Sequence, residues 1–136
     1  MEQITVKATI KATPNKVWGV WTTPEHIKIW NTPSNDWHTT RAKNDLRVGG
    51  KFLSRMEAKD GSFGFDFTGT YDEVSPFECI AYTMDDGRKA KTNFSQKENY
   101  TEIITVFDPE TQNSIEMQKE GWQAILNNFK KYTESL

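Results

Sequence analysis

Hydrophobic and polar residues alternate strictly at the start of the chain. The apolar residues have even numbers and polar residues lie between them: Ile4, Val6, Ala8, Ile10 and Ala12 against Gln3, Thr5, Lys7, Thr9 and Lys11. A period of two is typical of a β-strand with one solvated face. The pattern therefore predicts an N-terminal strand that buries its even-numbered side chains.

Two helix-start signals of the same type follow this strand. Thr13-Pro14 and Thr23-Pro24 each place a hydroxyl at the N-cap and a proline at the first helical position. We predict short helices over residues 14–21 and 24–30. Their candidate buried residues are Val17, Trp18, Trp21, Ile27 and Trp30.

From Trp37 onward the pattern indicates an antiparallel meander. The expected strands are 37–43, 50–58, 63–74, 78–85, 89–97 and 100–108. Dipeptides that suit tight turns separate them: Gly49-Gly50, Asp60-Gly61, Ser75-Pro76 and Asp86-Gly87. Gly69 lies inside the third of these strands, which predicts a bulge or a sharp bend at that position.

A long amphipathic helix is predicted over residues 113–134. Asn113 to Glu116 fit a capping box, although Asp108-Pro109-Glu110 could begin the helix one turn earlier. Apolar side chains then recur at helical spacing: Ile115, Trp122, Ile125, Leu126, Phe129 and Tyr132. Gly121 in mid-helix costs about 1 kcal/mol relative to alanine, which indicates a close approach to the sheet or to a cavity.

The order of these elements favours an α+β fold. A run of strands separated from the helices argues against a doubly wound parallel sheet. A curved antiparallel sheet around the long C-terminal helix is the simplest way to bury both apolar faces. We expect one domain over residues 1–136.

Charge and composition narrow the classes of function. Seventeen basic and nineteen acidic side chains give a net charge of -2, which removes the electrostatic basis for unselective binding to nucleic acids or anionic membranes. No apolar run approaches the roughly 18 residues of a membrane span, and no signal peptide is visible. A single cysteine, Cys79, excludes an internal disulfide and a cysteine metal cluster. We expect a cytoplasmic protein without a cofactor or metal.

Four strings, in order along nearly the whole chain, resemble one family. They are residues 13–26 (TPNKVWGVWTTPEH), 45–52 (DLRVGGKF), 69–76 (GTYDEVSP) and 121–132 (GWQAILNNFKKY). The family is that of the homologues of the activator of the 90-kDa heat shock protein ATPase, within the START-like (SRPBCC) superfamily. The resemblance implies a helix-grip fold around an apolar cavity that binds small hydrophobic molecules. The sequence departs from the family's double tryptophan, because Asn31 follows Trp30.

Aromatic and other apolar side chains are the candidate lining of that cavity. They are Trp18, Trp21, Trp30, Phe52, Met56, Phe65, Phe67, Tyr71, Tyr82, Met84, Phe94, Trp122, Ile125 and Phe129. The alternative is that these residues fill a packed core and leave no cavity. Candidate polar groups are the indole N–H groups, the Tyr82 hydroxyl, Thr92 and Arg41.

No catalytic constellation is visible. His26 and His38 lack metal-ligand spacing, and Cys79 lies among apolar neighbours that favour an inert thiol. An enzyme would have to use Asp66 or Glu73 as its acid or base, with Tyr82 as hydrogen-bond donor. The basic run at residues 88–91 is typical of a solvated hairpin end, with an acidic protein partner as the alternative.

Three hypotheses of function remain. The first is a module that binds a small apolar or amphipathic molecule without covalent chemistry. The second, implied by the resemblance alone, is a stress-related protein that binds a heat-shock chaperone and modulates its ATPase. The third is a cyclase- or hydrolase-like enzyme that uses the same cavity. The chain could be a monomer or a homodimer, since a sheet of this kind has exposed edges.

Overall fold

A computed structural model describes residues 2–136 and confirms the α+β order of elements. The strands and helices are β1 (Ile4–Ile10), α1 (Pro14–Thr22), α2 (Pro24–Trp30), β2 (Trp37–Asn44), β3 (Lys51–Ala58), β4 (Gly64–Ser75), β5 (Cys79–Met84), β6 (Lys89–Gln96), β7 (Thr101–Phe107) and α3 (Ile115–Ser135). None of the helices in this described part is both long enough and apolar enough to cross a bilayer.

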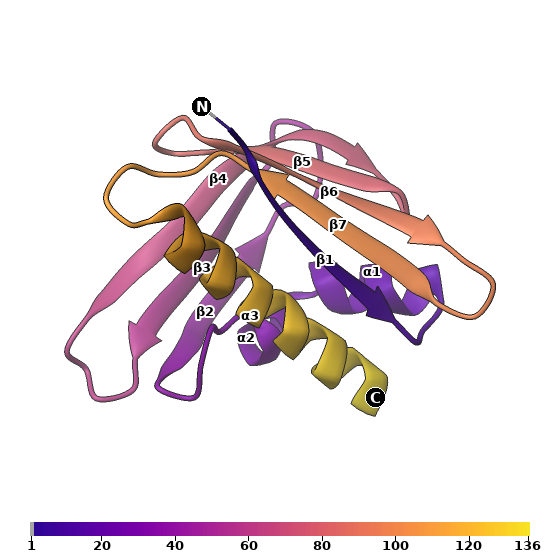
Figure 1. Cartoon of the computed structure of the whole chain (residues 1–136), viewed down its shortest axis with the longest axis horizontal. Coiled ribbons are helices and arrows are strands. Elements are labelled where there is room, and N and C mark those ends of the chain that lie inside the picture. Colours follow the sequence, from indigo (N-terminus) through magenta and orange to yellow (C-terminus); the bar gives the residue numbers. More distant parts are fainter. Residues whose placement is uncertain (1) are drawn as a thin grey trace.

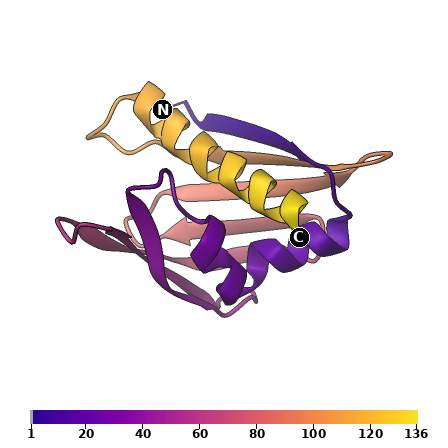
Figure 2. The same ribbon diagram turned by 90° about the horizontal axis from the view of Figure 1, so that it is seen from below.

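All neighbouring strands pair antiparallel in one sheet, in the order β1-β7-β6-β5-β4-β3-β2. Strands β2 to β7 follow one another as hairpins, and β1 joins at the far end beside β7, with Ile4 opposite Phe107. The sheet curls into a half-barrel, and α3 crosses its concave face (Figures 1 and 2). This arrangement is the helix-grip fold that the sequence predicts.

The helix starts follow the local signals, with one correction. The Thr13 hydroxyl accepts a hydrogen bond of 3.3 Å from the Lys16 amide and caps α1. In α3 the cap is Ser114, which accepts from the Met117 amide at 3.1 Å, and not Asn113. The helix does not begin a turn earlier, because the Glu110 carboxylate accepts from the Asn113 amide at 2.6 Å and closes a loop there.

Of the two features predicted at Gly69, a bulge or a sharp bend, the bulge is not found at this residue. Gly69 pairs regularly with Phe52 on one side and Met84 on the other, and the β4–β5 register shifts only after Tyr71. A Cβ atom at position 69 would lie 2.7 Å from the Phe52 ring and 2.8 Å from the Thr83 carbonyl oxygen. The glycine therefore leaves free the space beside the strand that the Phe52 ring occupies.

The packed core lies beside the C-terminal half of α3. Ile10, Val17, Ile103 and Phe129 are fully buried there. These side chains come from β1, α1, β7 and α3, so they bring the first and last elements of the chain together. Because the packing is concentrated at this end, the space between the sheet and the N-terminal half of α3 is less filled.

Side chains of α3 also hold the free edge of β1. The Gln123 amide accepts from the Lys7 backbone N–H at 3.3 Å and donates to the Lys7 carbonyl at 2.9 Å. The Lys130 ammonium donates to the Thr9 carbonyl, and the Glu134 carboxylate accepts from the Lys11 amide at 2.9 Å. The helix is therefore fixed to one margin of the sheet along most of its length.

Candidate functional site

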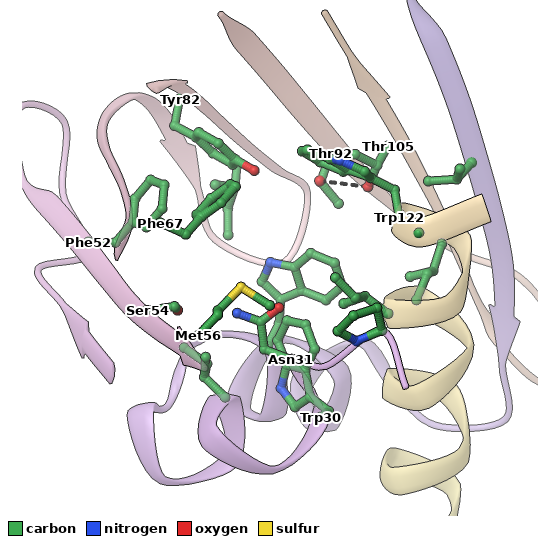
Figure 3. A pocket seen from close by; sticks show the side chains of 18 of the residues that line it. Trp30, Asn31, Phe52, Ser54, Met56, Phe67, Tyr82, Thr92, Thr105 and Trp122 are labelled. Atoms are coloured by element: carbon green, nitrogen blue, oxygen red, sulfur yellow. Dashed lines mark hydrogen bonds between the residues drawn. The ribbon is translucent and has the colours of Figure 1, made fainter. Parts of the chain in front are cut away.

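A cavity of about 420 Å³ lies between the concave face of the sheet and α3. Its wall includes side chains from β3 to β7, from α2 and the segment after it, and from α3. In Figure 3, Phe52, Phe67 and Tyr82 from the sheet and Trp122 from α3 surround this space. The interior between the sheet and α3 therefore contains a hollow as well as a core.

Ten of the fourteen predicted lining residues do line this cavity. They are Trp21, Trp30, Phe52, Met56, Phe65, Phe67, Tyr71, Tyr82, Trp122 and Ile125. Phe65 is the most exposed of these ten residues, with 39% of its surface exposed. These residues therefore form the cavity wall, and their binding of a ligand in the cavity stays a prediction.

The other four predicted residues are not in the cavity wall, which corrects the sequence-based assignment. Met84 is buried at the end of β5. Trp18 and Phe94 meet edge to face, with ring centres 5.5 Å apart, and Phe129 packs against Trp21 at 4.9 Å. Edge-to-face contacts of this kind are typical of a filled aromatic core. These rings support the wall from behind.

Two aromatic groups form opposite sides of the cavity. On the sheet, the rings of Phe52 and Tyr82 pack at 4.7 Å. On the helix, Trp122 stacks on Phe107 with ring centres 3.7 Å apart and an angle of 8°. Phe67 lies between the two groups, 6.3 Å from the Trp122 ring. The wall is therefore formed by aromatic rings packed against one another and is mainly apolar, as ligand cavities usually are.

Polar groups interrupt this wall at a few points. The buried hydroxyls of Thr92 and Thr105 bond to each other at 2.8 Å (Figure 3). The Tyr71 hydroxyl donates to the Asn44 amide oxygen, and Asn44 donates in turn to the Thr22 carbonyl at 2.7 Å. The cavity thus contains neutral hydrogen-bonding groups, among them Tyr82 and Thr92, which the sequence predicts. The indole N–H of Trp30, also a predicted candidate, donates to the Val20 carbonyl at 2.9 Å.

Arg41, the remaining polar candidate, does not line the cavity. The β2–β3 register shifts between Thr39 and Arg41, and Arg41 then pairs with Arg55 on the exposed side. Sequence reasoning also missed Ser54 and Thr105, which do line the cavity. The strand period would have found both, because Ser54 shares its parity with Phe52 and Met56, and Thr105 shares its parity with the buried Ile103 and Phe107.

Burial raises the pKa of both tyrosines that line the cavity. For Tyr71 the hydrogen bond to Asn44 opposes this rise but does not cancel it. For Tyr82 burial is again the largest cause of the raised pKa, the neighbouring Tyr71 adds to it, and the positive charge of Arg88 opposes it. Both phenols are therefore neutral at ordinary pH, and Tyr82 can act as a hydrogen-bond donor.

The two carboxylates that the sequence suggests for an enzyme, Asp66 and Glu73, lie outside the cavity wall, whereas Glu110 is part of it. Asp66 is exposed and lies 3.4 Å from an Arg55 guanidinium nitrogen. Glu73 lies 3.5 Å from the Lys91 ammonium. Neither residue lines the cavity. Asp66 and Glu73 are therefore not placed to act as an acid or base beside Tyr82.

His26 and Cys79 lie in surroundings that favour a structural role over a chemical one. His26 Nδ1 lies 2.6 Å from the Tyr132 hydroxyl, where it ties α2 to α3. Cys79 is buried, and desolvation together with the nearby Glu73 raises the pKa of its thiol. A raised pKa opposes thiolate formation and nucleophilic chemistry. Within residues 2–136, no three His, Cys, Asp or Glu side chains gather so that they could hold a metal ion.

Solved structures of two bacterial proteins resemble this fold at substantial sequence identity. The AHSA1-like protein from Aeromonas hydrophila is 44% identical with a TM-score of 0.92, over 98% of this chain and 92% of that protein. A protein from Cytophaga hutchinsonii is 49% identical with a TM-score of 0.85, over 98% and 92% of the two chains. The Aha1 dimer from Colwellia psychrerythraea, at 19% identity and a TM-score of 0.77 over 98% and 97%, shares the fold.

Comparison with models of protein families agrees with the structural resemblance. None of the curated proteins compared with the chain matches it. The model of the family described as activator of Hsp90 ATPase homolog 1-like protein matches residues 11–134. This match includes the four strings recognised in the sequence, every element from α1 to β7, and α3 up to residue 134. The chain therefore belongs to the family of activator of Hsp90 ATPase homolog 1-like proteins.

Proposed function

We propose that this protein binds a small, mainly apolar molecule in the cavity between its sheet and α3, without changing it covalently. The observation that carries the proposal is the cavity of about 420 Å³ with its aromatic wall. Its volume falls in the usual range of small-molecule sites, about 300–1,000 Å³. The absence of Asp66 and Glu73 from the wall favours binding over the enzymatic alternative.

Position 121 supports the proposal independently. Gly121 lies in mid-helix, lines the cavity, and has no atom within 4 Å of where its Cβ would be. Alanine there would stabilise the helix by about 1 kcal/mol and meet no obstacle. A glycine that leaves the cavity wide at a cost in stability is expected where a ligand occupies the space.

The test is native mass spectrometry of the protein purified from its own host, followed by organic extraction. We expect a stoichiometric small molecule on the wild-type chain and little or none on Gly121→Leu, whose side chain would extend into the cavity. Gly19→Leu is the matched control, because Gly19 is also helical with open space and does not line the cavity. Equal occupancy of all three proteins would contradict the proposal.

A second candidate function is modulation of a heat-shock chaperone ATPase. Its support is the description of the matched family, which names an activator of Hsp90 ATPase. The assay is chaperone ATPase activity with and without micromolar protein, together with a pull-down. A complex with altered ATPase turnover would support this role, and the absence of both would remove it.

A further inference from the structure

Contacts of α3 close the cavity along both sides of the helix. Along β1, the Gln123 side chain fixes the helix to the edge of the sheet. On the opposite side, Asn128 of α3 donates to the Thr32 carbonyl and, at 3.3 Å, to the Thr32 hydroxyl. The Thr39 hydroxyl of β2 donates to the Asn31 carbonyl at 2.6 Å. The segment after α2 is therefore held between the helix and the sheet, and the packed core fills the space beside the C-terminal half of α3.

The exposed residues of the wall indicate where the cavity meets solvent. They are Lys43, Phe65 and Asn113. Next to Lys43, Asn44 donates to the Thr22 carbonyl at 2.7 Å and ties β2 to the end of α1. Phe65 lies at the start of β4 and Asn113 just before α3, and Figures 1 and 2 show the β3–β4 hairpin and the first turn of α3 at the same end of the molecule. The mouth of the cavity is therefore between these two elements.

The apolar wall continues beyond Phe65 onto the surface. The Trp37 ring centre lies 6.0 Å from those of Phe63 and Phe65, which are 6.2 Å from each other. Phe65 is paired across the strands with Met56, which also lines the cavity, whereas Trp37 and Phe63 do not line it. Phe63 is 62% exposed. These three rings, the outer cluster, form an exposed aromatic surface that shares one member with the cavity wall.

The surface around the outer cluster favours an apolar occupant. Arg55 of β3 is already paired with Glu57 at 3.0 Å and with Asp66 at 3.4 Å. Asp36 and Lys59, both exposed and of opposite charge, are neighbours, since the Lys59 amide donates to the Asp36 carbonyl at 2.8 Å. Because neither sign of charge prevails, this surface has no field that would attract an acidic or a basic macromolecule. Clustered exposed apolar side chains mark binding surfaces, whereas single ones need no explanation.

We propose that Trp37, Phe63 and Phe65 form an outer binding site at the mouth of the cavity, on which an apolar molecule first binds and over which it enters and leaves. The inference rests on the proposed function and adds the route of its ligand. Trp37 and Phe63 lie outside the cavity wall, so they contact the ligand during passage and not in its final position. Their removal should therefore slow association and dissociation by the same factor and leave the Kd unchanged.

The test is stopped-flow fluorescence of the full chain with N-phenyl-1-naphthylamine, an apolar probe whose emission rises in apolar surroundings. In the double variant Trp37→Ser with Phe63→Ser, we expect kon and koff each to fall about fivefold, while the Kd stays within about twofold of the wild-type value. Gly121→Leu should give the opposite signature, a weaker Kd, because its side chain would occupy the cavity. The two kinds of variant thus separate the route from the final site.

Further variants serve as controls. Phe63→Ser alone changes a mostly exposed side chain, so it tests the route even if the double variant folds poorly. Tyr100→Ser removes an aromatic ring that is 38% exposed and does not line the cavity, and it should leave both rates unchanged. Met117→Ser removes a side chain that is 62% exposed in the first turn of α3, and it should slow binding less than the double variant.

The outcomes distinguish the two proposals. Unchanged rates in the variants of Trp37 and Phe63, or a larger effect of Met117→Ser, overturn the outer site and leave binding in the cavity in place. A Kd that weakens as much as kon falls also overturns it, because the rings would then contact the ligand in its final position. If the wild type does not bind the probe, or Gly121→Leu leaves its Kd unchanged, both proposals are overturned.

Discussion

Thr133 and Thr101 give a test in which the same substitution has opposite effects. Both threonines are fully buried. The Thr101 hydroxyl donates to the Ala12 carbonyl at 2.8 Å, whereas the Thr133 hydroxyl has no partner in the described part of the chain. Valine has nearly the shape of threonine and replaces the hydroxyl by a methyl group, so each change isolates the hydroxyl.

The expected magnitudes follow from the cost of an unpaired group. Burying a hydroxyl without a partner costs about 1–3 kcal/mol, so Thr133→Val should stabilise the protein by about 1–2 kcal/mol. Unfolding entropy of about 2.1 cal/mol/K per residue gives roughly 0.29 kcal/mol/K for 136 residues. The Tm should therefore rise by about 3.5–7 °C. Thr101→Val leaves the Ala12 carbonyl unpaired and should lower the stability by about 1–3 kcal/mol.

The assay is reversible urea unfolding of the three proteins at one pH, with calorimetry for the Tm. Because each change leaves volume and helix or strand propensity nearly constant, the unfolding slope m should not change. A Thr133→Val protein that is less stable than the wild type would refute the reasoning. So would a Thr101→Val protein that is as stable as the wild type.

Two further predictions concern the sheet and the cavity wall. Gly69→Ala should destabilise the protein by about 1–3 kcal/mol in urea unfolding, because its Cβ would meet the Phe52 ring and the Thr83 carbonyl; unchanged stability would contradict the packing described. The pKa values of Tyr71 and Tyr82 are raised by burial. Their contribution to stability is therefore complete below the unfolded-state pKa of about 10 and is lost as the pH rises above it. Ultraviolet titration of phenolate should show both ionising later than free tyrosine, and ordinary titration of both would be evidence against their burial.

The sequence predicted the elements because their signals are local. Alternation over β1 and the threonine-proline pairs before α1 and α2 involve neighbours within one turn or one strand. The distinction between Trp18 and Trp21 is not local. Both are aromatic residues of α1, but Trp18 packs against Phe94 with no cavity contact, and Trp21 touches the cavity. Which ring meets another ring and which meets space depends on how far the sheet curls.

Arg41 and Gly69 show the same limit within single strands. The side of the sheet on which Arg41 lies depends on a register shift after Thr39, which alternation along β2 does not reveal. A glycine in a strand indicates either a bulge or a close approach, and only the position of Phe52 decides between them at Gly69. Sequence patterns therefore predict which side chains of a strand share a face, but not which residue each of them contacts.

The contacts between α3 and β1 link the integrity of the cavity to resistance against aggregation. An edge strand exposes backbone groups that can template pairing with another chain. At β1, both backbone groups of Lys7, the Thr9 carbonyl and the nearby Lys11 amide are already bonded to α3 side chains. A second chain could add a strand at this edge only after α3 had moved away, which would also open the cavity wall at Trp122. A molecule bound against α3 would therefore stabilise the arrangement in which the helix covers this edge strand.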